Sequence, residues 1–317
     1  MNTYIIAGGA GFIGSHLVRE LLNRGDKVIV IDNLLTGSEK NIEPFYDNPL
    51  FSFINHDLSA GIPNIAGDIE GIFHLASPAS PNAKSPKSYI AHPVETLMVN
   101  SVGTKHVLDL AKRKGAKVVY ASSSEIYGDP DHSPQKEEYF GNVSPNGPRS
   151  VYDEGKRFGE AICAAYARTH NVDTRTIRIF NTYGDHMQRD DGRVVSNFIL
   201  QAIAGDEITI YGDGNQTRSF CFVDDLVDGL RKVMDKDGLK GQVFNLGNPE
   251  EYKIKELAEK IIKLTDSKSK IVHEDLPIDD PRQRKPDISK AKDAFGFDPQ
   301  VNVDEGLKRT IDYFRGL

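Results

Sequence analysis

Apolar and polar positions in the first part of the chain alternate in a strand–helix rhythm. Residues 3–7, TYIIA, form a short apolar run that ends in glycines. The stretch GGAGFIGSHLVRELLNRG follows, and after it comes the second apolar run KVIVID. A strand, a tight turn, a helix and another strand in this order predict a parallel crossover unit.

The same rhythm continues to about residue 180. Residues 93–113 and the stretch from residue 150 to about His170 have helical patterns of apolar positions, whereas residues 129–149 are rich in proline, asparagine and charge and predict an ordered surface loop. Further strands are predicted at residues 51–58, at 70–76, at 117–121 and in TRTIRIFNTYG. The pattern predicts an α/β fold with a Rossmann-type, doubly wound parallel sheet.

Beyond residue 180 the rhythm loosens. We predict hairpin-like strands in ITIYGDGNQTRSFCF, a helix that starts near Asp224 or Asp225, a strand at VFNLG, and helices at RVVSNFILQAIAG and KIKELAEKIIKLT. We therefore expect two domains, residues 1–179 and a smaller C-terminal α/β domain of residues 180–317. The boundary is soft, and the chain can cross it more than once.

Composition narrows the classes of partner. A net charge of −7 argues against nucleic acid or an acidic membrane surface as a partner. Two cysteines cannot form a disulfide framework, and neither has a metal-ligand spacing, so we expect a reducing compartment and no metal. No apolar run is long enough for a membrane span, and a strand that starts near Thr3 leaves no room for a signal peptide. We expect a cytoplasmic protein.

The first turn carries the strongest binding signal. Gly8, Gly11 and Gly14 let backbone N–H groups approach a pyrophosphate, and the helix that follows adds the positive end of its dipole. Asp32 closes the second strand, where a carboxylate can accept hydrogen bonds from ribose hydroxyls and would repel a 2′-phosphate. The unit predicts a dinucleotide site that prefers NAD to NADP.

Tyr152 and Lys156 stand four residues apart in SVYDEGKRFGEA, on one face of the predicted helix. Lowering a tyrosine pKa from about 10 to about 7 needs roughly 4 kcal/mol. A unit charge about 4 Å away in a partly screened site supplies about that much. The pair could thus act as a general base, although a solvated surface pair has the same spacing.

Two further groups of residues are weaker candidates. Three serines in SSSEIYG follow the strand at residues 117–121, directly before the Tyr152 helix, and a hydroxyl there could bind both a substrate hydroxyl and the tyrosine. Arg193 and Arg218 could hold a diphosphate, or each could be an ordinary surface arginine.

The spacing of the three glycines resembles that of the short-chain dehydrogenase/reductase superfamily. This resemblance implies that Tyr152 and Lys156 are catalytic with Ser123, and that Asp57 meets the adenine amino group unless it is only a strand-end cap. It also implies that the helix at residues 93–113 and the Tyr152 helix form a four-helix dimer interface. From the residues alone, both helices could equally cover the sheet.

Longer blocks narrow the resemblance. The blocks GGAGFIGSHL, HLASPASP, SSSEIYGDP, YDEGKR, RIFNTYG, DGRVVSNFILQA, YGDGNQTRSF, NLGNPEE and DPRQRKPDISKAK occur in this order. Together they resemble the UDP-glucuronate decarboxylase (UDP-xylose synthase) family of the extended superfamily, over essentially all 317 residues. The resemblance implies that UDP-glucuronate is oxidised at carbon 4 on one bound NAD, loses carbon dioxide as a β-keto acid, and is reduced to UDP-xylose.

Roles for single residues are also implied by this resemblance. Tyr152 is the base and Lys156 is its electrostatic partner. Ser123, at a position that is often threonine in the family, helps to bind and polarise the substrate at carbon 4. Glu125 and Arg284 act on the carboxylate end of the substrate, and Ser124 has a role intermediate between theirs. Arg282 is the alternative to Arg284 as the cation. The implied cofactor contacts are Gly8, Gly11, Phe12, Ile13, Gly14, Asp32, Asn33, Thr36, Gly37, Asp57, Leu58, Leu75, Ala76, Tyr152 and Lys156. The implied substrate contacts are Asn181, Arg193, Tyr211, Arg218 and Arg284.

Three alternatives stay open at this point. A nucleotide-sugar 4,6-dehydratase usually has an aspartate at the position of Ser124. A 4-epimerase needs neither Glu125 nor a cation for a carboxylate. An NAD-binding regulator needs only the glycine turn and Asp32, so retention of Tyr152, Lys156 and Ser123 argues against it. Membrane-anchored family members carry an N-terminal span that this sequence lacks, so we expect a form without a membrane anchor. The resemblance also implies a homodimer.

Overall fold

A seven-stranded sheet, parallel throughout, lies at the centre of the computed structural model, which describes residues 1–275 and 283–317. Its order is β11-β6-β5-β4-β1-β2-β3, and every ladder in it is parallel. The strands are β1 Thr3–Ala7, β2 Lys27–Asp32, β3 Phe51–Asn55, β4 Gly71–His74, β5 Lys117–Ser123, β6 Thr174–Ile179 and β11 Gln242–Leu246. The predicted doubly wound sheet is confirmed, and its order reverses between β1 and β4, where such sheets bind ligands.

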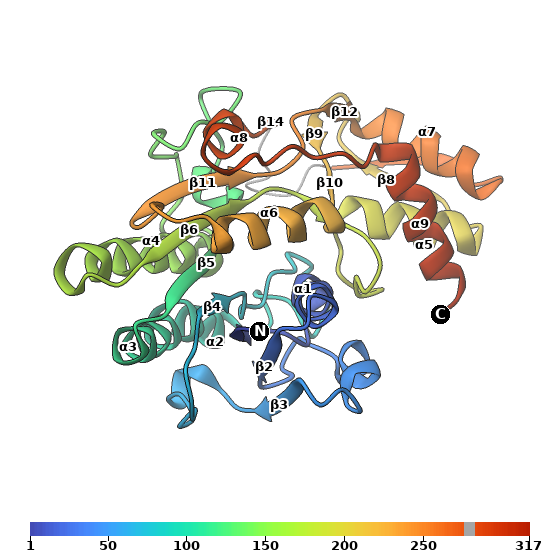
Figure 1. Cartoon of the computed structure of the whole chain (residues 1–317). Helices are drawn as coiled ribbons and strands as arrows, with labels where there is room; N and C mark the ends of the chain where they lie inside the picture. The colour runs from blue at the N-terminus through green and yellow to red at the C-terminus, as the bar shows by residue number, and fades with distance from the viewer. Residues whose placement is uncertain (276–282) are drawn as a thin grey trace.

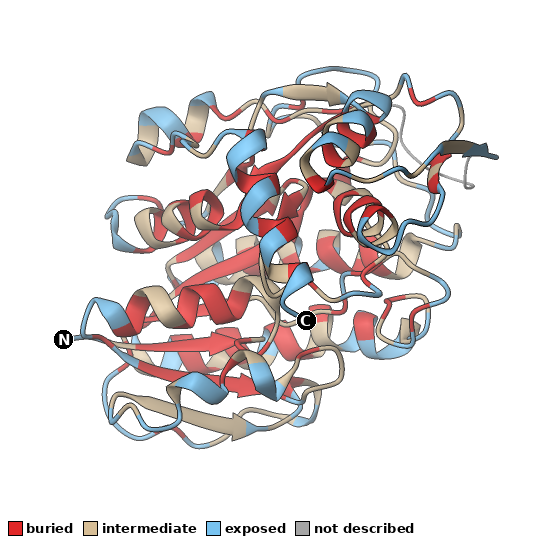
Figure 2. Cartoon of the chain, turned by 90° about the vertical axis from the view of Figure 1, so that its right-hand side faces the viewer, coloured by how far each residue is buried: buried red, intermediate tan, exposed pale blue. Residues whose placement is uncertain are grey.

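Helices cover both faces of the sheet (Figure 1). The helices α1 Phe12–Asn23 and α6 Val223–Asp235 pack on one face, and α3 Thr104–Lys114 and α4 Ser150–His170 pack on the other. Successive strand residues point to opposite faces, so Ile5 joins one core and Ile6 the other. Figure 2 shows the inner strands of the sheet buried, whereas the edge strand β3 is partly exposed and the outer faces of the helices are exposed.

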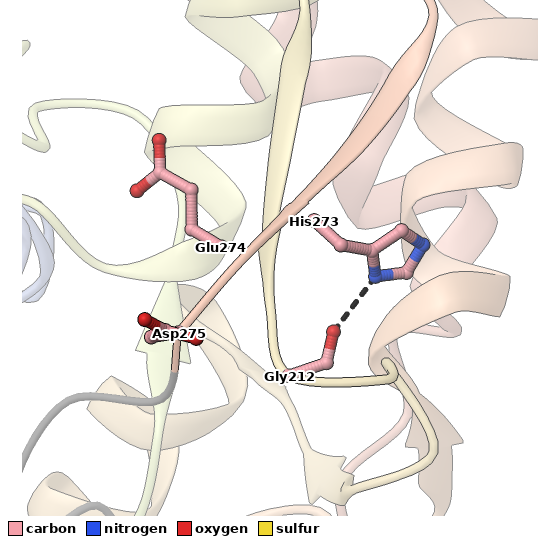
Figure 3. A pocket seen from close by; sticks show the side chains of 4 residues that line it. All are labelled: Gly212, His273, Glu274 and Asp275. Carbon is pink, nitrogen blue, oxygen red and sulfur yellow. Dashed lines mark hydrogen bonds between the residues drawn. The ribbon is translucent and has the colours of Figure 1, made fainter.

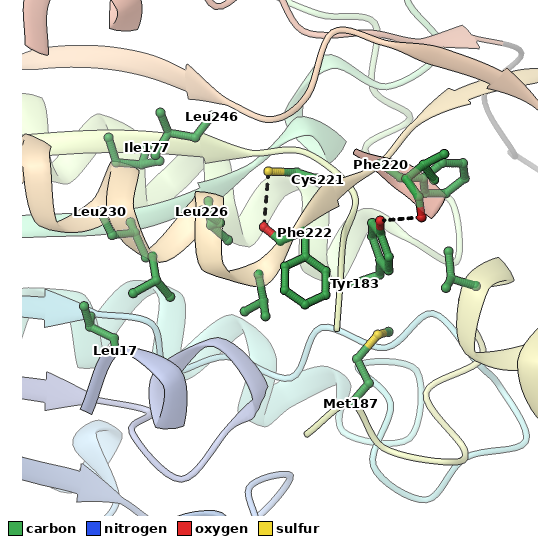
Figure 4. Packing of buried hydrophobic residues seen from close by; sticks show 14 of the residues in the cluster. Leu17, Ile177, Tyr183, Met187, Phe220, Cys221, Phe222, Leu226, Leu230 and Leu246 are labelled. Carbon is green, nitrogen blue, oxygen red and sulfur yellow. Dashed lines mark hydrogen bonds between the residues drawn. The ribbon is translucent and has the colours of Figure 1, made fainter. Parts of the chain in front are cut away.

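The second half of the chain packs against one side of this unit (Figure 1). It contains the helices α5 Val194–Ala204, α7 Ile254–Thr265, α8 Ser289–Phe295 and α9 Val303–Arg315. Its short strands are β7 Thr182–Tyr183, β8 Ile208–Tyr211, β9 Thr217–Ser219, β10 Cys221–Phe222, β12 Glu251–Lys253, β13 Ile271–Glu274 and β14 Gln283–Arg284. One hydrophobic core continues from Leu17 of α1 to Tyr183 and Phe222, so the two halves share buried apolar surface (Figure 4).

Three local predictions are wrong. The expected hairpin does not form, because β8 pairs with β13, β9 with β12 and β14, and β10 with β7. The third strand ends at Asn55, because Asp57 accepts a hydrogen bond from the backbone N–H of Ser59 (2.7 Å) and begins a 3₁₀ turn. The helix expected at residues 93–113 is interrupted by a π-helical turn.

That π turn, Val99–Gly103, lies between α2 Pro93–Met98 and α3. It places Asn100 in the interior, where its side-chain amide donates to Ser77 Oγ (2.9 Å) and its carbonyl accepts from the Tyr120 hydroxyl (3.2 Å). Single π turns inside helices are frequent at functional sites, and this one faces the glycine turn of β1 through Val99.

The chain returns to the central sheet after residue 180. The strand β11 pairs with β6, and α6 packs on α1, β5 and β6. Residues 129–149 form neither helix nor extended ladder, as predicted. Cys163 and Cys221 are free and buried. Within the two described ranges, none of the helices is both long and apolar enough to cross a membrane.

Candidate active site

The glycines of the turn after β1 allow other groups to approach its backbone closely. Gly8 has φ +83°, and a Cβ there would lie 2.7 Å from the backbone nitrogen of Ala76. A Cβ on Gly14 would lie 2.2 Å from the carbonyl oxygen of Gly8, so α1 packs directly on the turn. The N-cap of α1 is Gly11, with no side-chain cap and no acidic residue in the first turn. The first N–H groups of α1 are therefore available to an anion.

Asp32 closes one side of this turn. Its carboxylate accepts hydrogen bonds from the backbone N–H groups of Ala10 (3.0 Å) and Leu34 (2.8 Å). Burial raises the pKa of Asp32, and these two hydrogen bonds oppose the shift. The side chain also lines the cleft described next, where its remaining lone pairs can accept hydrogen bonds from ribose hydroxyls.

A cleft opens at the carboxyl ends of β1, β2 and β4. Most of the predicted cofactor contacts line it, namely Gly8, Gly11, Asp32, Asn33, Thr36, Gly37, Asp57, Leu58, Leu75 and Ala76. Phe12, Ile13 and Gly14 instead form the start of α1. Sequence reasoning missed further lining residues, including His56, Ser77, Pro78, Glu95 and Val99. The open helix terminus, the glycine cradle and the buried carboxylate fit a dinucleotide.

We predict that the protein binds NAD at least about tenfold more tightly than NADP, because a 2′-phosphate beside the Asp32 carboxylate would place like charges together. Titration of the protein with each dinucleotide measures this ratio. The Asp32→Asn substitution should reduce this preference for NAD over NADP. Its side-chain oxygen keeps one acceptor for the Ala10 and Leu34 N–H groups. Tighter binding of NADP by the unmodified protein would contradict the assignment of Asp32.

Tyr152 and Lys156 lie on the first turns of α4, against the end of β5. Both side chains are buried, and Lys156 Nζ donates a hydrogen bond to the carbonyl oxygen of Ala121 (2.8 Å). The ammonium lies 5.5 Å from the centroid of the Tyr152 ring. Ser123, the last residue of β5, lies close enough to Tyr152 for its hydroxyl to favour the ionised phenol. The structure thus brings the predicted trio together at one end of the sheet.

The pKa values of Tyr152 and Lys156 differ from the expectation. Burial raises the pKa of Tyr152 to about 12, and the nearby hydroxyl of Ser123 opposes that shift. Burial lowers the pKa of Lys156 to about 7. The prediction that Lys156 by itself brings the phenol near neutrality is therefore wrong for the protein alone. The reason is that both groups lose hydration, and each then resists its charged form.

Glu125 lies in the 3₁₀ turn Ser124–Tyr127 that follows β5. Its two carboxylate oxygens form separate ion pairs, one with Arg149 Nη2 and the other with Arg284 Nη1. Burial opposes ionisation of this carboxyl group, but the two guanidinium groups outweigh it and hold its pKa well below the usual range. Glu125 is therefore an anion held between two cations, close to Tyr152.

Arg284 comes to this site from the other half of the chain. It lies in β14, directly beside Arg218 of β9 in the register of the two parallel strands. Arg284 is only 4% exposed, so it is not the surface arginine of a basic loop. Its Nε and Nη2 atoms are buried and have no hydrogen-bond partner among the described residues. Buried N–H groups of this kind usually have a partner, and a bound anion would supply one. The alternative cation, Arg282, lies outside the described residues.

The strand that carries Arg284 is held by the loop at residues 129–149. Gln135 exchanges two hydrogen bonds with Lys285, one from its backbone N–H and one to its side-chain oxygen, each 2.8 Å long. The Asn245 amide in β11 donates to the carbonyl oxygens of Gln135 (3.0 Å) and Asp287 (3.1 Å). Asn245 also accepts from the hydroxyl of Tyr127 (2.8 Å), in the Glu125 turn. These bonds fix Arg284 relative to Glu125.

The other predicted substrate residues are spread more widely. Ser124 is buried beside Glu125. Asn181 lies between β6 and β7, and its carbonyl oxygen accepts from the N–H of Cys221 (2.9 Å). Arg193 is the N-cap of α5, pairs with Asp191 (2.9 Å), and is close enough for its charge to act on Tyr152. Tyr211 is 41% exposed on β8, and no contact among the described residues joins its side chain to this cluster.

Three residues of the cluster were not predicted. Arg149 precedes α4 and pairs with Glu125. Tyr89 stacks on the ring of Tyr152 with centroids 5.0 Å apart. Asp153, next to Tyr152, is buried, and its Oδ1 has no hydrogen-bond partner in the described part of the chain. The only sequence signal was the position of Arg149 and Asp153 near Tyr152, and nothing in the pattern marked Asp153 as buried or Arg149 as a partner of Glu125.

A second, more open hollow lies in the C-terminal half (Figure 3). Gly212, His273, Glu274 and Asp275 line it, and His273 Nδ1 is hydrogen-bonded to the carbonyl oxygen of Gly212 (2.7 Å). Two carboxylates at its rim would repel an anionic ligand. It also contains none of the predicted cofactor contacts, ten of which line the cleft at the sheet edge, so that cleft is the better candidate for the cofactor site.

Comparison with known proteins agrees with this geometry. The family described as "NAD dependent epimerase/dehydratase family" matches residues 4–247. UDP-glucuronic acid decarboxylase 1 of Xenopus tropicalis is 48% identical over 311 residues, which are 98% of this chain and 72% of that protein. UDP-glucuronic acid decarboxylase 5 of Arabidopsis thaliana is 48% identical over 312 residues, which are 98% of this chain and 89% of that protein.

Solved structures share the whole fold. UDP-glucose 4-epimerase of Thermotoga maritima has a TM-score of 0.87 at 28% identity, with 99% of each chain covered. UDP-glucuronic acid 4-epimerase of Bacillus cereus, solved in complex with UDP-glucuronic acid and NAD, has a TM-score of 0.86 at 26% identity, also with 99% of each chain covered.

The chain therefore belongs to the NAD dependent epimerase/dehydratase family, whose members use the Rossmann sheet seen here. Its cofactor is NAD. Within that class, the nearly full-length matches at close to half identity place it in the family of the UDP-glucuronic acid decarboxylases.

Proposed function

We infer that this chain is an NAD-dependent UDP-glucuronate decarboxylase that forms UDP-xylose through a 4-keto intermediate. The observation that carries this inference is Arg284, a buried arginine held beside Glu125 near Tyr152. Two of its nitrogen atoms, Nε and Nη2, have no hydrogen-bond partner among the described residues. A 4-epimerase has no need for a cation at the carbon 5 substituent of a neutral sugar. A substrate with a carboxylate on carbon 5 needs one for orientation.

NAD held by the residues of the sheet-edge cleft would supply the reversible oxidation of carbon 4. We propose that Tyr152 takes the proton from the carbon 4 hydroxyl, with Ser123 holding that hydroxyl by a hydrogen bond. Because burial raises the pKa of Tyr152, the phenolate needs more stabilisation than Lys156 alone supplies in the protein without cofactor. The positive charge of the oxidised cofactor and the Lys156 ammonium would supply this stabilisation.

At the carboxylate end, we propose that Arg284 binds the substrate carboxylate through its unpaired N–H groups. Once carbon 4 is a ketone, the substrate is a β-keto acid, and the electrons of the breaking bond flow into the ketone as an enolate. An arginine that held the carboxylate too tightly would favour the ground state and slow this step. Glu125, which already occupies Arg284 Nη1, weakens that grip.

The remaining predicted contacts complete the proposal. Gly8, Gly11, Asp32 and the other residues of the sheet-edge cleft hold NAD, while Asn181, Arg193, Tyr211 and Arg218 hold the nucleotide part of the sugar. Residues 1–179 would then form the NAD-binding domain and residues 180–317 the nucleotide-sugar-binding domain. In this division the chain returns to the first domain to add α6 and β11.

Two features argue against the neighbouring activities. Ser124 stands where a 4,6-dehydratase usually has an aspartate, and its hydroxyl cannot donate a proton as readily as a carboxylic acid. The doubly paired Glu125, with Arg284 beside it, is superfluous for epimerisation at carbon 4 of a neutral sugar. The residues at the carboxylate end therefore favour a substrate with a carboxylate on carbon 5, and the 48% identity to UDP-glucuronic acid decarboxylases favours its decarboxylation over its epimerisation.

We also propose a homodimer. The helices α2 and α4 pack together and expose a row of large apolar side chains, Val94, Leu97, Met98 and Phe158. An apolar surface of this kind on two adjacent helices favours pairing with a second copy. Sedimentation velocity that found only monomers at micromolar concentration would contradict the dimer.

The two free cysteines suit a reducing compartment, so we propose a cytoplasmic location. Fractionation of cells that recovered the protein outside the cytoplasm would contradict it.

The function is tested by incubating the purified protein with UDP-glucuronate and measuring carbon dioxide. Release of one carbon dioxide for each UDP-glucuronate consumed is expected. A 4-epimerase, a 4,6-dehydratase or an NAD-binding regulator would release none, so consumption without carbon dioxide, or no reaction at all, would overturn the proposal.

A further inference from the structure

Lys156 is a buried cation, and the proposed reaction needs its charge. The residue is 3% exposed, its Nζ donates a hydrogen bond to the carbonyl oxygen of Ala121 (2.8 Å), and burial lowers the pKa of the ammonium to about 7. A buried charge is costly unless neighbouring groups replace the water that it has lost. The groups around Lys156 therefore determine the pH up to which it remains charged.

Two tyrosine rings face this ammonium. Its Nζ lies 5.4 Å from the centroid of the Tyr120 ring and 5.5 Å from that of the Tyr152 ring. The face of an aromatic ring is negative and attracts a cation within about 6 Å, most strongly where water is excluded. Tyr120 lies in β5 and is fully buried, and burial raises its pKa, so the ring remains neutral. Tyr120 can therefore favour the charged lysine, although it has no part in the reaction outlined above.

Tyr120 is held in place by two other elements. Its hydroxyl donates to the side-chain carbonyl of Asn100 (3.2 Å), in the π turn. The same hydroxyl occupies the space beside Gly159 of α4, where a Cβ would lie 1.9 Å from the hydroxyl oxygen. Glycine in the interior of a helix is less favourable than alanine. A smaller apolar side chain at position 120 would not need this glycine, so filling the core does not by itself explain the tyrosine.

The other titratable groups in this region come from β4, β5 and α4. Burial and the charge of Lys156 lower the pKa of His74 to about 3, and burial raises the pKa of Cys163, so both are neutral at pH 7. Glu160 instead pairs with Arg178 (2.8 Å). The groups whose charges act on the hydroxyl of Tyr152 are Glu125, Asp153 and Arg193. In the described part of the chain none of these carboxylates pairs with Lys156, which leaves the ring faces to favour its charge.

We propose that Tyr120 is a positioning residue, whose ring face keeps Lys156 charged beside Tyr152 during the reaction. The proposal rests on the proposed function and adds to it a residue behind the catalytic pair. A cation–π contact that is shielded from water is strong enough to move a pKa by about one unit. Because a lysine is charged below its pKa, loss of the ring should make Lys156 give up its proton about one pH unit lower.

The direct test measures the pKa of Lys156 by NMR, in protein labelled with ¹³C at lysine Cε and loaded with NADH. The signal of Lys156 is identified by its loss in Lys156→Met. Combining Tyr120→Leu with Gly159→Ala removes the ring and returns apolar volume to the space that its hydroxyl occupied, so the site stays buried. In this double variant the pKa of Lys156 should be about one unit lower than in the unmodified protein.

Tyr120→Phe is the matched control, because it keeps the ring face and removes only the hydroxyl. The pKa of Lys156 should then change by less than about a third of a unit. An unchanged pKa in the double variant, or an equal fall in Tyr120→Phe, would overturn the proposal.

Thermal unfolding checks the packing on which this test depends. Gly159→Ala alone should be less stable than the unmodified protein, because its Cβ would meet the Tyr120 hydroxyl, and adding Tyr120→Leu should restore the stability. Equal stability of Gly159→Ala and the unmodified protein would mean that Tyr120 does not occupy that space, and would also overturn the proposal.

The pH dependence of turnover connects the lysine to the reaction. On the alkaline side, carbon dioxide release should decline at a pH about one unit lower in the double variant and at the usual pH in Tyr120→Phe. A profile that did not move in the double variant would overturn the role of Tyr120 in the reaction. The NMR measurement involves no turnover, so it remains valid if the protein releases no carbon dioxide, the result by which the proposed function itself would fail.

Discussion

Tyr152→Phe is expected to lower turnover of UDP-glucuronate by about 10²–10⁴-fold, the usual contribution of a positioned general base. The phenyl ring can keep its stack on Tyr89, whose centroid is 5.0 Å away, and only the hydroxyl that meets Ser123 is removed. Binding of NAD and of UDP should therefore stay close to that of the unmodified protein. Steady-state rates and ligand titrations measure the two effects separately.

A matched control is available on the same helix. Tyr166 also lies in α4, but its hydroxyl donates to Asp109 (2.7 Å), far along the helix from the active site. Tyr166→Phe should leave turnover within about twofold of normal, because a surface substitution of this kind has little effect on stability. Near-normal activity of Tyr152→Phe would remove Tyr152 from the mechanism.

Arg284→Ala is expected to weaken UDP-glucuronate about 10²-fold while changing UDP-xylose much less, because only the former has a carboxylate. Truncating one partner of a buried, hydrogen-bonded charge pair costs about 2–5 kcal/mol. The unpaired Nε and Nη2 atoms would be the donors that the carboxylate loses. Binding constants of both nucleotide sugars, measured on the NADH-loaded protein, give the comparison.

Lys285→Ala is the control for this variant. Lys285 follows Arg284 in the chain, but its ammonium pairs with Glu251 (2.9 Å) and not with Glu125. Its removal should change both constants by less than about threefold. If Arg284→Ala instead weakened both ligands equally, Arg284 would belong to the diphosphate site.

The sequence was sufficient for the sheet and for much of the cofactor cleft. Both depend on local signals, namely the alternation of apolar runs with helical patterns, and glycines whose spacing allows a close turn. Gly8, Gly14 and Asp32 lie close together in the chain, so one crossover unit contains the whole signal.

The features that could not be predicted depend on contacts between distant segments. The strands β8, β9 and β10 pair with strands far along the chain and not with one another, and the local pattern gives no signal for such distant pairs. Arg149 and Asp153 look like ordinary charges at the start of a helix, and only packing reveals that they meet Glu125. Burial also reverses the electrostatic argument for Tyr152, because desolvation depends on what surrounds a group and not on spacing in the sequence.

The most direct test of the whole account is the product formed from UDP-glucuronate in D₂O, observed by NMR. Oxidation at carbon 4, loss of the carboxyl group and protonation of the resulting enolate from solvent together predict UDP-xylose with one deuterium on carbon 5. A product that kept its carboxylate, such as the carbon 4 epimer, would contradict the account, as would UDP-xylose without deuterium.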